Sequence, residues 1–183
     1  MSGRLVLIYK KFTGKHLIVH NAIQTGLLMG CGDLIAQTVV EKKPLSDVDV
    51  TRTAKFFSFG IIFVGPTIST WYKFLDKKFI AQAGQLVNKK HVLFKKVALD
   101  QFVFAPSFIA VFLGVLNAAE GRNLSETRKE ITNKYPDILT ANYKLWPWVQ
   151  LVNFYFVPLR HQVLVVQSVA LLWNTYISWK SHA

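Results

Sequence analysis

The residues with the clearest chemical potential in this sequence are acids and amides placed inside long apolar stretches. Asp33 and Gln37 lie one helical turn apart in a segment with no other acid, and Asp100 stands at the head of another apolar segment. A carboxylate in the bilayer interior costs at least about 2.5 kcal/mol on insertion scales, so Asp33 must bind a partner, line water or be protonated. Two interpretations stay open for Asp33: a bond to a neighbouring helix, or a charge beside an aqueous path. For Asp100, near the end of its segment, the simpler expectation is a salt bridge with loop lysines.

A second set of polar residues lies in the apolar stretch 144–180. If residues 146–157 form a helix, two amides share one face, and the next segment repeats that spacing with two more. These amides are Gln150, Asn153, Gln167 and Asn174. Arg160 is the only certain charge between the two lysines that bound the stretch. An amide stripe surrounded by hydrocarbon is typical of helices that face lipid outside and pack polar groups inside.

The remaining candidates for catalysis or metal binding form no recognisable motif. The five histidines are scattered, and the pair at helical spacing, His16 and His20, has no third ligand within sequence reach. The single cysteine, Cys31, excludes an internal disulfide and a cysteine-based metal site. No glycine-rich phosphate loop and no nucleophile elbow occurs. We therefore expect a protein that is not an enzyme and that uses no cofactor or metal.

Membrane helices must position these polar residues. With 51% hydrophobic and only 17% charged residues, the chain of 183 residues is more apolar than soluble domains. We expect a single all-α membrane domain over residues 1–183, an integral helical bundle with four transmembrane helices and a fifth, C-terminal membrane segment left open. The hydrophobic segments are expected at 17–40, 56–72, 97–119, 145–159 and 162–179. Kinks are expected at Pro66, Pro106, Pro147 and Pro158.

Small residues predict where these helices approach one another. Gly26 and Gly30 form a G-x-x-x-G pair on the Asp33 face of the first segment, a spacing that lets another backbone come close. In the second segment, Gly65 and Pro66 interrupt the helix within a face of small residues. We predict that these four positions pack helix against helix.

Two polar segments precede or connect the apolar ones. Residues 1–16 contain no acid and place basic side chains opposite apolar ones, which predicts an uncleaved mitochondrial address; a membrane-surface anchor is the alternative. Residues 123–135 predict a short polar helix outside the bilayer, with Ser125 at its N-cap and Pro136 at its end.

The basic excess has two candidate partners. A net charge of +12 could suit nucleic acid, but the basic residues fall mainly between apolar segments, as Lys77, Lys78, Lys89, Lys90, Lys95 and Lys96 show. Basic loops beside membrane spans direct topology and bind anionic lipid headgroups. We therefore expect the lipid bilayer and its anionic headgroups as partners, leave homo-oligomer formation open, and expect no direct nucleic-acid binding.

Five runs in the sequence resemble one known family. They are M-G-x-G-D-x-x-x-Q (29–37), G-P-x-x-x-x-W-Y-x-x-L-D (65–76), D-Q-x-x-F-A-P-x-F (100–108), W-P-x-x-Q-x-x-N-F-x-x-V-P (146–158) and W-N-x-Y-x-S-W (173–179). In this order they resemble the Mpv-seventeen/peroxisomal-membrane-protein family, and most closely the mitochondrial inner-membrane branch that gives the family its name. Two positions depart from the family pattern: Ser69 stands where many members have His, and Gln162 where Arg is usual. No histidine chemistry and no role for Arg160 is therefore carried over.

The resemblance implies a channel-forming protein of the mitochondrial inner membrane. Such a protein would pass ions or small metabolites and support metabolite and nucleotide supply and mitochondrial DNA maintenance, with its inward polar faces around water. The candidate pore-lining residues are Asp33, Gln37, Asp100, Gln150, Asn153, Gln167 and Asn174. The alternative is a non-conducting scaffold or assembly protein of mitochondria or peroxisomes, in which the same amides only hold helices together. The expected location is the mitochondrial inner membrane, as a multi-pass protein, with the peroxisomal membrane as the alternative.

Overall fold

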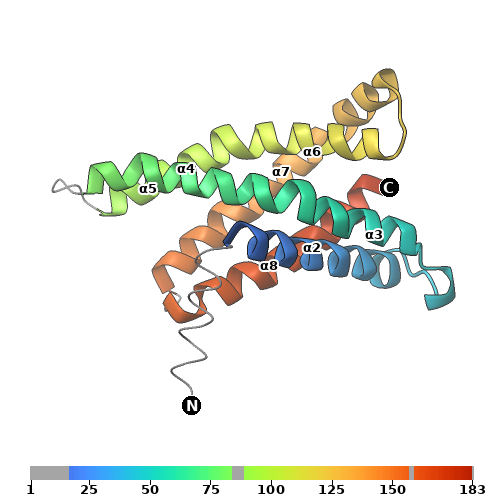
Figure 1. Ribbon diagram of the computed structural model, residues 1–183, viewed down its shortest axis with the longest axis horizontal. Helices are drawn as coiled ribbons and strands as arrows, with labels where there is room; N and C mark the ends of the chain where they lie inside the picture. The colour runs from blue at the N-terminus through green and yellow to red at the C-terminus, as the bar shows by residue number, and fades with distance from the viewer. Residues whose placement is uncertain (1–16, 84–88, 157–158, 183) are drawn as a thin grey trace, which may run out of the picture.

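Helices make up nearly all of the described structure. The computed structural model describes residues 17–83, 89–156 and 159–182, and these ranges contain no strand (Figure 1). In chain order the elements are α2 (Leu17–Ile35) and the π turn η1 (Ala36–Val40); the 3-10 turn η2 (Leu45–Asp47); α3 (Val50–Phe59), the π turn η3 (Gly60–Val64) and α4 (Gly65–Ala83); α5 (Lys89–Leu99), the π turn η4 (Asp100–Phe104) and α6 (Ala105–Ala119); α7 (Leu124–Phe156); and α8 (Leu159–His182). The predicted all-α class is confirmed. The segment predicted at 1–16 lies outside the described residues.

Because η3 and η4 each join two helices and η1 extends α2, the described residues form long rods with two distinct ends (Figure 1). The α2–α3 connection, the α6–α7 connection and the last turn of α8 gather at one end, and the end of α4 and the start of α5 lie at the other. We call the first the mixed-charge end (residues 41–49, 120–137 and 180–182) and the second the lysine end (residues 73–83 and 89–96). At the mixed-charge end, Lys180 pairs with Asp137 at 2.7 Å, which joins α8 to α7.

An apolar core fills the space between the rods. α2 packs against α8 and the α3–α4 rod, while α7 packs against both α6 and α8. Aromatic rings of the α3–α4 rod meet rings of α6 across the core, with 5.2 Å between the centroids of Phe59 and Phe112. The buried core residues are Met29, Phe56, Val64, Ile109, Phe112, Leu113, Leu116, Ile138 and Ile177. Every rod contributes at least one of them, so hydrocarbon occupies the centre of the bundle.

Three glycines bring α2 against the α3–α4 rod. Gly26 and Gly60 face each other, and a Cβ atom on Gly60 would lie only 2.6 Å from the Gly26 Cα. A Cβ atom on Gly65 would lie 2.5 Å from a Cα of α2. Gly30 has more room, since its nearest neighbour would be a Phe57 side-chain carbon at 3.3 Å. The closest approach of the two backbones is therefore at Gly26, Gly60 and Gly65, where a side chain would force the helices apart.

Pro66 and Pro106 each follow a π turn. The Gly65 N–H donates to the Gly60 carbonyl and the Ala105 N–H to the Asp100 carbonyl, five residues back in both cases. In a regular helix the proline ring clashes with the carbonyl four residues earlier, and a π turn locally widens the helix. The structure therefore shows a local widening at these prolines, and the kinks stay a prediction. Of the other two predicted kinks, Pro147 lies inside α7 and Pro158 lies outside the described residues.

α7 is one helix where the sequence predicts a short polar helix and a separate apolar segment. Its first turn is capped by Asn123, whose side chain accepts from the Glu126 N–H at 2.9 Å while the Glu126 carboxylate accepts from the Asn123 N–H at 2.9 Å. The N-cap predicted at Ser125 is therefore wrong, and so is the helix end predicted at Pro136, through which α7 continues. Proline removes one backbone hydrogen bond, but Ile138 just beyond it is fully buried in the core, and this packing holds the helix.

Two stretches of the described helices are long and apolar enough to cross a membrane, Ile18–Val40 and Phe94–Ala119. They overlap the segments predicted at 17–40 and 97–119. The charged residues of the other rods, such as the three lysines in the second half of α4, lower the hydropathy there. The count of four transmembrane helices stays a prediction.

Candidate functional site

Asp33 lies at the centre of a buried polar cluster formed by α2, α3 and α8. Its side chain is fully buried. The Arg52 guanidinium donates to it at 2.7 Å, the Thr53 hydroxyl donates at 2.5 Å, and the Ser178 hydroxyl donates as well. Arg52 also donates to the Ser178 hydroxyl oxygen at 2.8 Å. A buried charge is tolerated when it is paired and hydrogen-bonded, so these contacts both neutralise Asp33 and tie three helices together.

Arg52 binds a second acid at the edge of this cluster. Glu41, directly after η1, accepts from the two terminal guanidinium nitrogens at 2.7 and 3.0 Å. Lys43 lies 3.1 Å from the same carboxylate. The hydrogen bond from Arg52 holds the pKa of Glu41 below its usual range. Two carboxylates, one guanidinium and one ammonium sum to zero charge, so this group is neutral without an external ion.

Gln37 connects the cluster to the start of α3. Its amide nitrogen donates to Asp33 at 2.8 Å, and its amide oxygen accepts from the Asp49 N–H at 2.7 Å. Asp49 caps α3 by accepting from the Arg52 N–H at 2.9 Å, which positions the residue that binds Asp33. We call the whole group the Asp33 cluster: Asp33, Gln37, Glu41, Arg52, Thr53 and Ser178.

A second polar cluster lies between α4, η4 and α7. The Trp71 indole N–H donates to Asp100 Oδ1 at 2.9 Å, and the Gln101 amide donates to Oδ2 at 3.0 Å. Gln101 and Asn142 are both buried, and the Asn142 amide donates to the Gln101 oxygen at 3.1 Å. We call these four residues, Trp71, Asp100, Gln101 and Asn142, the Asp100 cluster.

Where the sequence predicts a salt bridge between Asp100 and loop lysines, the structure places two neutral donors on its carboxylate. The physical reason is the position of its carboxylate, which meets the indole of Trp71 on the adjacent α4. Neutral donors therefore take the place that the sequence assigns to a cation.

Neither cluster groups three possible metal ligands. Over the described ranges, no three His, Cys, Asp or Glu side chains lie together as metal ligands would. What the two clusters can do is bind helices together and place charge inside an apolar bundle.

Comparison with known proteins shows a relationship along nearly the full chain. Residues 117–178 match the sequence profile of the Mpv17 / PMP22 family. The mitochondrial inner membrane protein Mpv17 of Danio rerio is 41% identical over 95% of this chain and 95% of its own length. The Homo sapiens protein of the same name is 41% identical over 95% of this chain and 96% of its own length. The chain belongs to the Mpv17/PMP22 family.

A relative with a different name is also similar over nearly the full chain. Protein sym-1 of Neurospora crassa is 37% identical over 93% of this chain and 95% of its own length. No solved structure matches the chain. The resemblance drawn from the five sequence runs is confirmed, and the protein is a mitochondrial inner-membrane protein, as its close relatives are by name.

The structure brings together only part of the polar set predicted for this Mpv17/PMP22 protein. Asp33 and Gln37 share one cluster, and each is 0% exposed and bonded within the chain. Of the two interpretations of Asp33, these contacts favour the bond to a neighbouring helix over contact with water. Asp100 belongs to the other cluster, on different helices.

Three of the four amides of the C-terminal stretch have described side chains, and these three belong to neither cluster. Asn174 of α8 lies against Gly32, since a Cβ atom on that glycine would be 2.7 Å from the Asn174 Cβ. Gln150 and Gln167 are half-buried on α7 and α8. Asn153 is in α7, but its side chain lies outside the described part of the chain. The pore-lining role of the whole set stays a prediction.

The sequence interpretation missed Arg52, Trp71 and Asn142. One signal could have found the first of them: an acid in an apolar segment needs a cation, and Arg52 is the nearest arginine to Asp33 along the chain. No comparable signal marks Trp71 or Asn142, because many neutral side chains could donate to a carboxylate.

Proposed function

We propose that this protein forms a gated channel that passes ions or small metabolites across the mitochondrial inner membrane. By doing so it supports the metabolite and nucleotide supply on which mitochondrial DNA maintenance depends. Solutes cross without chemical change, as expected for a chain without a catalytic motif. Charged and polar groups inside apolar helices are expensive, and in membrane proteins they mark ion paths.

The observation that carries this proposal is the order of layers along the bundle. On the α3–α4 rod, Arg52 of the Asp33 cluster comes first, Phe56 and Val64 of the apolar core follow, and Trp71 of the Asp100 cluster comes last. Two polar layers on either side of a hydrocarbon layer are the arrangement of a pore closed by a hydrophobic constriction.

The apolar core is the gate of the proposed channel. Narrow apolar constrictions exclude water and therefore ions, so the present conformation corresponds to the closed state. Opening requires the rods to separate at the core. The π turns η3 and η4 adjoin it, and π turns inside helices occur frequently at functional sites. Asp100, the first residue of η4, would move with that turn.

Conductance of the purified protein in planar bilayers tests the proposal. Leu113, 2% exposed, lies in the core, and the Leu113→Ser variant should raise the open probability because a hydroxyl lowers the barrier to water. Val111 is on the same helix but 51% exposed, so Val111→Ser is the matched control and should conduct like the parent. Silent bilayers for both the parent and Leu113→Ser, with melting curves that show both are folded, would overturn the channel.

A non-conducting scaffold is the second candidate, and the closure of the Asp33 cluster favours it. The groups of that cluster bond to one another and need no water path. Hydrogen bonds between membrane helices contribute about 0.6 kcal/mol each, so the polar residues could serve stability alone. A scaffold predicts no conductance together with stoichiometric co-purification of a partner from mitochondria, which separates it from the channel.

A further inference from the structure

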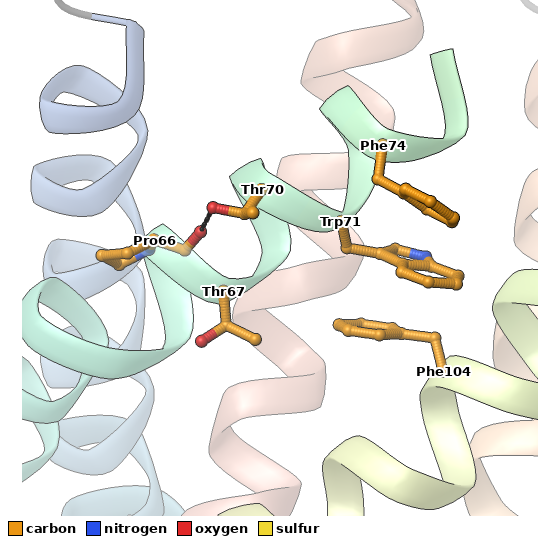
Figure 2. A pocket seen from close by; sticks show the side chains of 6 residues that line it. All are labelled: Pro66, Thr67, Thr70, Trp71, Phe74 and Phe104. Atoms are coloured by element: carbon orange, nitrogen blue, oxygen red, sulfur yellow. Dashed lines mark hydrogen bonds between the residues drawn. The ribbon is translucent and has the colours of Figure 1, made fainter. Parts of the chain in front are cut away.

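A cleft opens on the outside of the bundle between α4 and the η4–α6 turn. Its volume is about 620 Å³, and it is lined by Pro66, Thr67, Thr70, Trp71, Phe74 and Phe104 (Figure 2). The cleft lies outside the core, and it shares Trp71 with the Asp100 cluster, one polar layer of the proposed channel.

Three aromatic rings form a rigid wall of this cleft. Trp71 stacks on Phe104 with 4.7 Å between centroids and 9° between ring planes, and Phe74 lies on its other side at 5.5 Å (Figure 2). The hydrogen bond from Trp71 to Asp100 fixes the central ring. A pre-formed apolar wall on the outside of a helix pair suits a hydrocarbon chain, because the wall itself loses little conformational entropy when the chain binds.

The cleft continues into the lysine end. Lys78 places its ammonium 5.7 Å from the centroid of the Phe74 ring, so the same ring contacts both the cleft and a cation. Lys73, Lys77 and Lys95 are exposed nearby on α4 and α5. Between residues 73 and 96 the sequence has seven lysines and one acid, Asp76, so the segment is strongly cationic.

We propose that this cleft binds a phospholipid with an anionic headgroup. An acyl chain lies along the Trp71 wall, and the headgroup phosphate binds the lysines of α4 around Lys78. Anionic headgroups gain about 1 kcal/mol per nearby lysine, whereas a zwitterionic lipid lacks the net charge that gives this gain.

Charge complementarity also disfavours a second copy of the chain as the occupant. Apart from Asp76 of the lysine end, the acids outside the two clusters gather at the mixed-charge end: Asp47, Asp49, Glu120, Glu126, Glu130 and Asp137. A parallel neighbour in the same membrane would bring its own lysine end to this level, and like charges would repel. The anionic partner must therefore come from the lipid.

Lipid titration of the purified full chain in detergent tests the headgroup contact. Phosphatidylglycerol should raise the melting temperature of the parent, and phosphatidylcholine should not. Replacing Lys73, Lys77 and Lys78 together by Gln should increase the phosphatidylglycerol concentration for half-maximal stabilisation at least about tenfold. The matched control removes three cations elsewhere, with Lys55, Arg128 and Lys129 changed to Gln, and should titrate like the parent. If the two triple variants titrate alike, the proposal is overturned. It is also overturned if glycerol phosphate or a nucleotide stabilises the parent as much as phosphatidylglycerol does.

Two further variants test the acyl-chain contact. Thr67→Phe fills the cleft and should abolish stabilisation by phosphatidylglycerol, while Thr51→Phe, on an exposed site of α3, should not. Phe74→Ala removes a half-exposed ring of the wall and gives the same information if Thr67→Phe fails to fold. It should weaken lipid binding severalfold and leave the melting temperature without lipid unchanged. Undiminished binding by the folded variants would show that the lipid contacts only the lysines and would reject the cleft as its site.

Discussion

The Asp33 cluster and the Asp100 cluster each place a carboxylate inside an apolar helix, but only the first supplies a cation. Arg52, 7% exposed, contacts Asp33 at 2.7 Å. Asp100 instead accepts from the indole of Trp71 and the amide of Gln101, which are both neutral. The first carboxylate is half of an ion pair that joins helices, and the second is an acceptor of neutral hydrogen bonds beside a π turn.

This difference gives the two clusters different roles: the first stabilises the fold, and the second carries a charge that can be altered. Removing one member of a buried ion pair leaves the other charge uncompensated and costs about 3–5 kcal/mol, whereas a neutral hydrogen bond contributes about 0.5–1.5 kcal/mol. The bundle therefore depends on the Asp33 cluster for its fold, while the charge of Asp100 can change with the fold intact. If the protein conducts, Asp100 is the better position at which to alter selectivity.

The largest effect is expected from Arg52→Gln. This change leaves the fully buried Asp33 without its cation and should lower the free energy of unfolding by about 3–5 kcal/mol. Thermal unfolding in detergent measures it, with Lys55→Gln, an exposed cation on the same helix, as the control. If the two variants melt alike, the Asp33 cluster is not the stabilising region that the comparison requires.

The next largest effect is expected from Gly60→Leu. Its side chain meets the backbone of Gly26, so α2 must move away from α3, and the distance between Asp33 and Arg52 should grow. Overpacking of this kind costs about 1–3 kcal/mol. The control is Gly121→Leu. Gly121 has no neighbour within 4 Å but has a φ of +79°, so this variant shows the effect of backbone strain without steric crowding. Hydrogen exchange should increase in α2 and α3 and stay unchanged around Asp100; uniform protection in Gly60→Leu would contradict the proposed close contact.

Asp100→Asn should have a smaller effect on stability and a larger one on conduction. The Asn oxygen can still accept from Trp71, so we expect a loss of at most about 1.5 kcal/mol in unfolding free energy. In planar bilayers with a salt gradient the reversal potential should shift toward anion selectivity, because one negative charge is gone. Asp33→Asn is the matched change in the other cluster and should instead destabilise the protein. If instead Asp100→Asn destabilises the protein and Asp33→Asn shifts the reversal potential, the roles assigned to the two clusters are wrong.

The smallest effect is expected at the edge of the Asp33 cluster, where Glu41 binds Arg52. Because this bond lowers the folded-state pKa of Glu41, its contribution is complete above the unfolded pKa of about 4.3 and is lost as the pH falls through the lower folded value. The parent should therefore melt above Glu41→Gln at neutral pH, and the gap should close below about pH 4. A gap that is constant with pH would mean that Glu41 acts through packing rather than charge.

The sequence could predict the helices and the need for a partner at Asp33, but it could not predict which partner. A carboxylate in hydrocarbon requires compensation, and this requirement is local. The identity of Arg52 depends on how closely α2 and α3 cross, which is decided by Gly26 and Gly60 together. The end expected at Pro136 for a short helix over residues 123–135 was wrong for a related reason, because burial of Ile138 outweighs the local effect of Pro136.

For Asp100, the sequence favours partners that differ from the observed one. Its nearest cations along the chain are lysines, and sequence proximity favoured them, yet Trp71 is its observed partner. Which side chain reaches a carboxylate depends on the rotation of the helix about its axis. A single π turn changes that rotation, and nothing in the spacing of apolar residues reveals it in advance.

The η4 turn determines where this helix can lose a residue. A π turn holds about one residue more than an α turn, and each residue rotates an α-helix by about 100°. Loss of Phe102 or Val103, which are both exposed, would therefore convert η4 to an ordinary turn and keep Asp100 directed at Trp71. The same loss within α6 would rotate the residues on its two sides relative to one another by about 100°. Inheritable single-residue deletions should therefore be tolerated at these two positions of η4 and eliminated within α6.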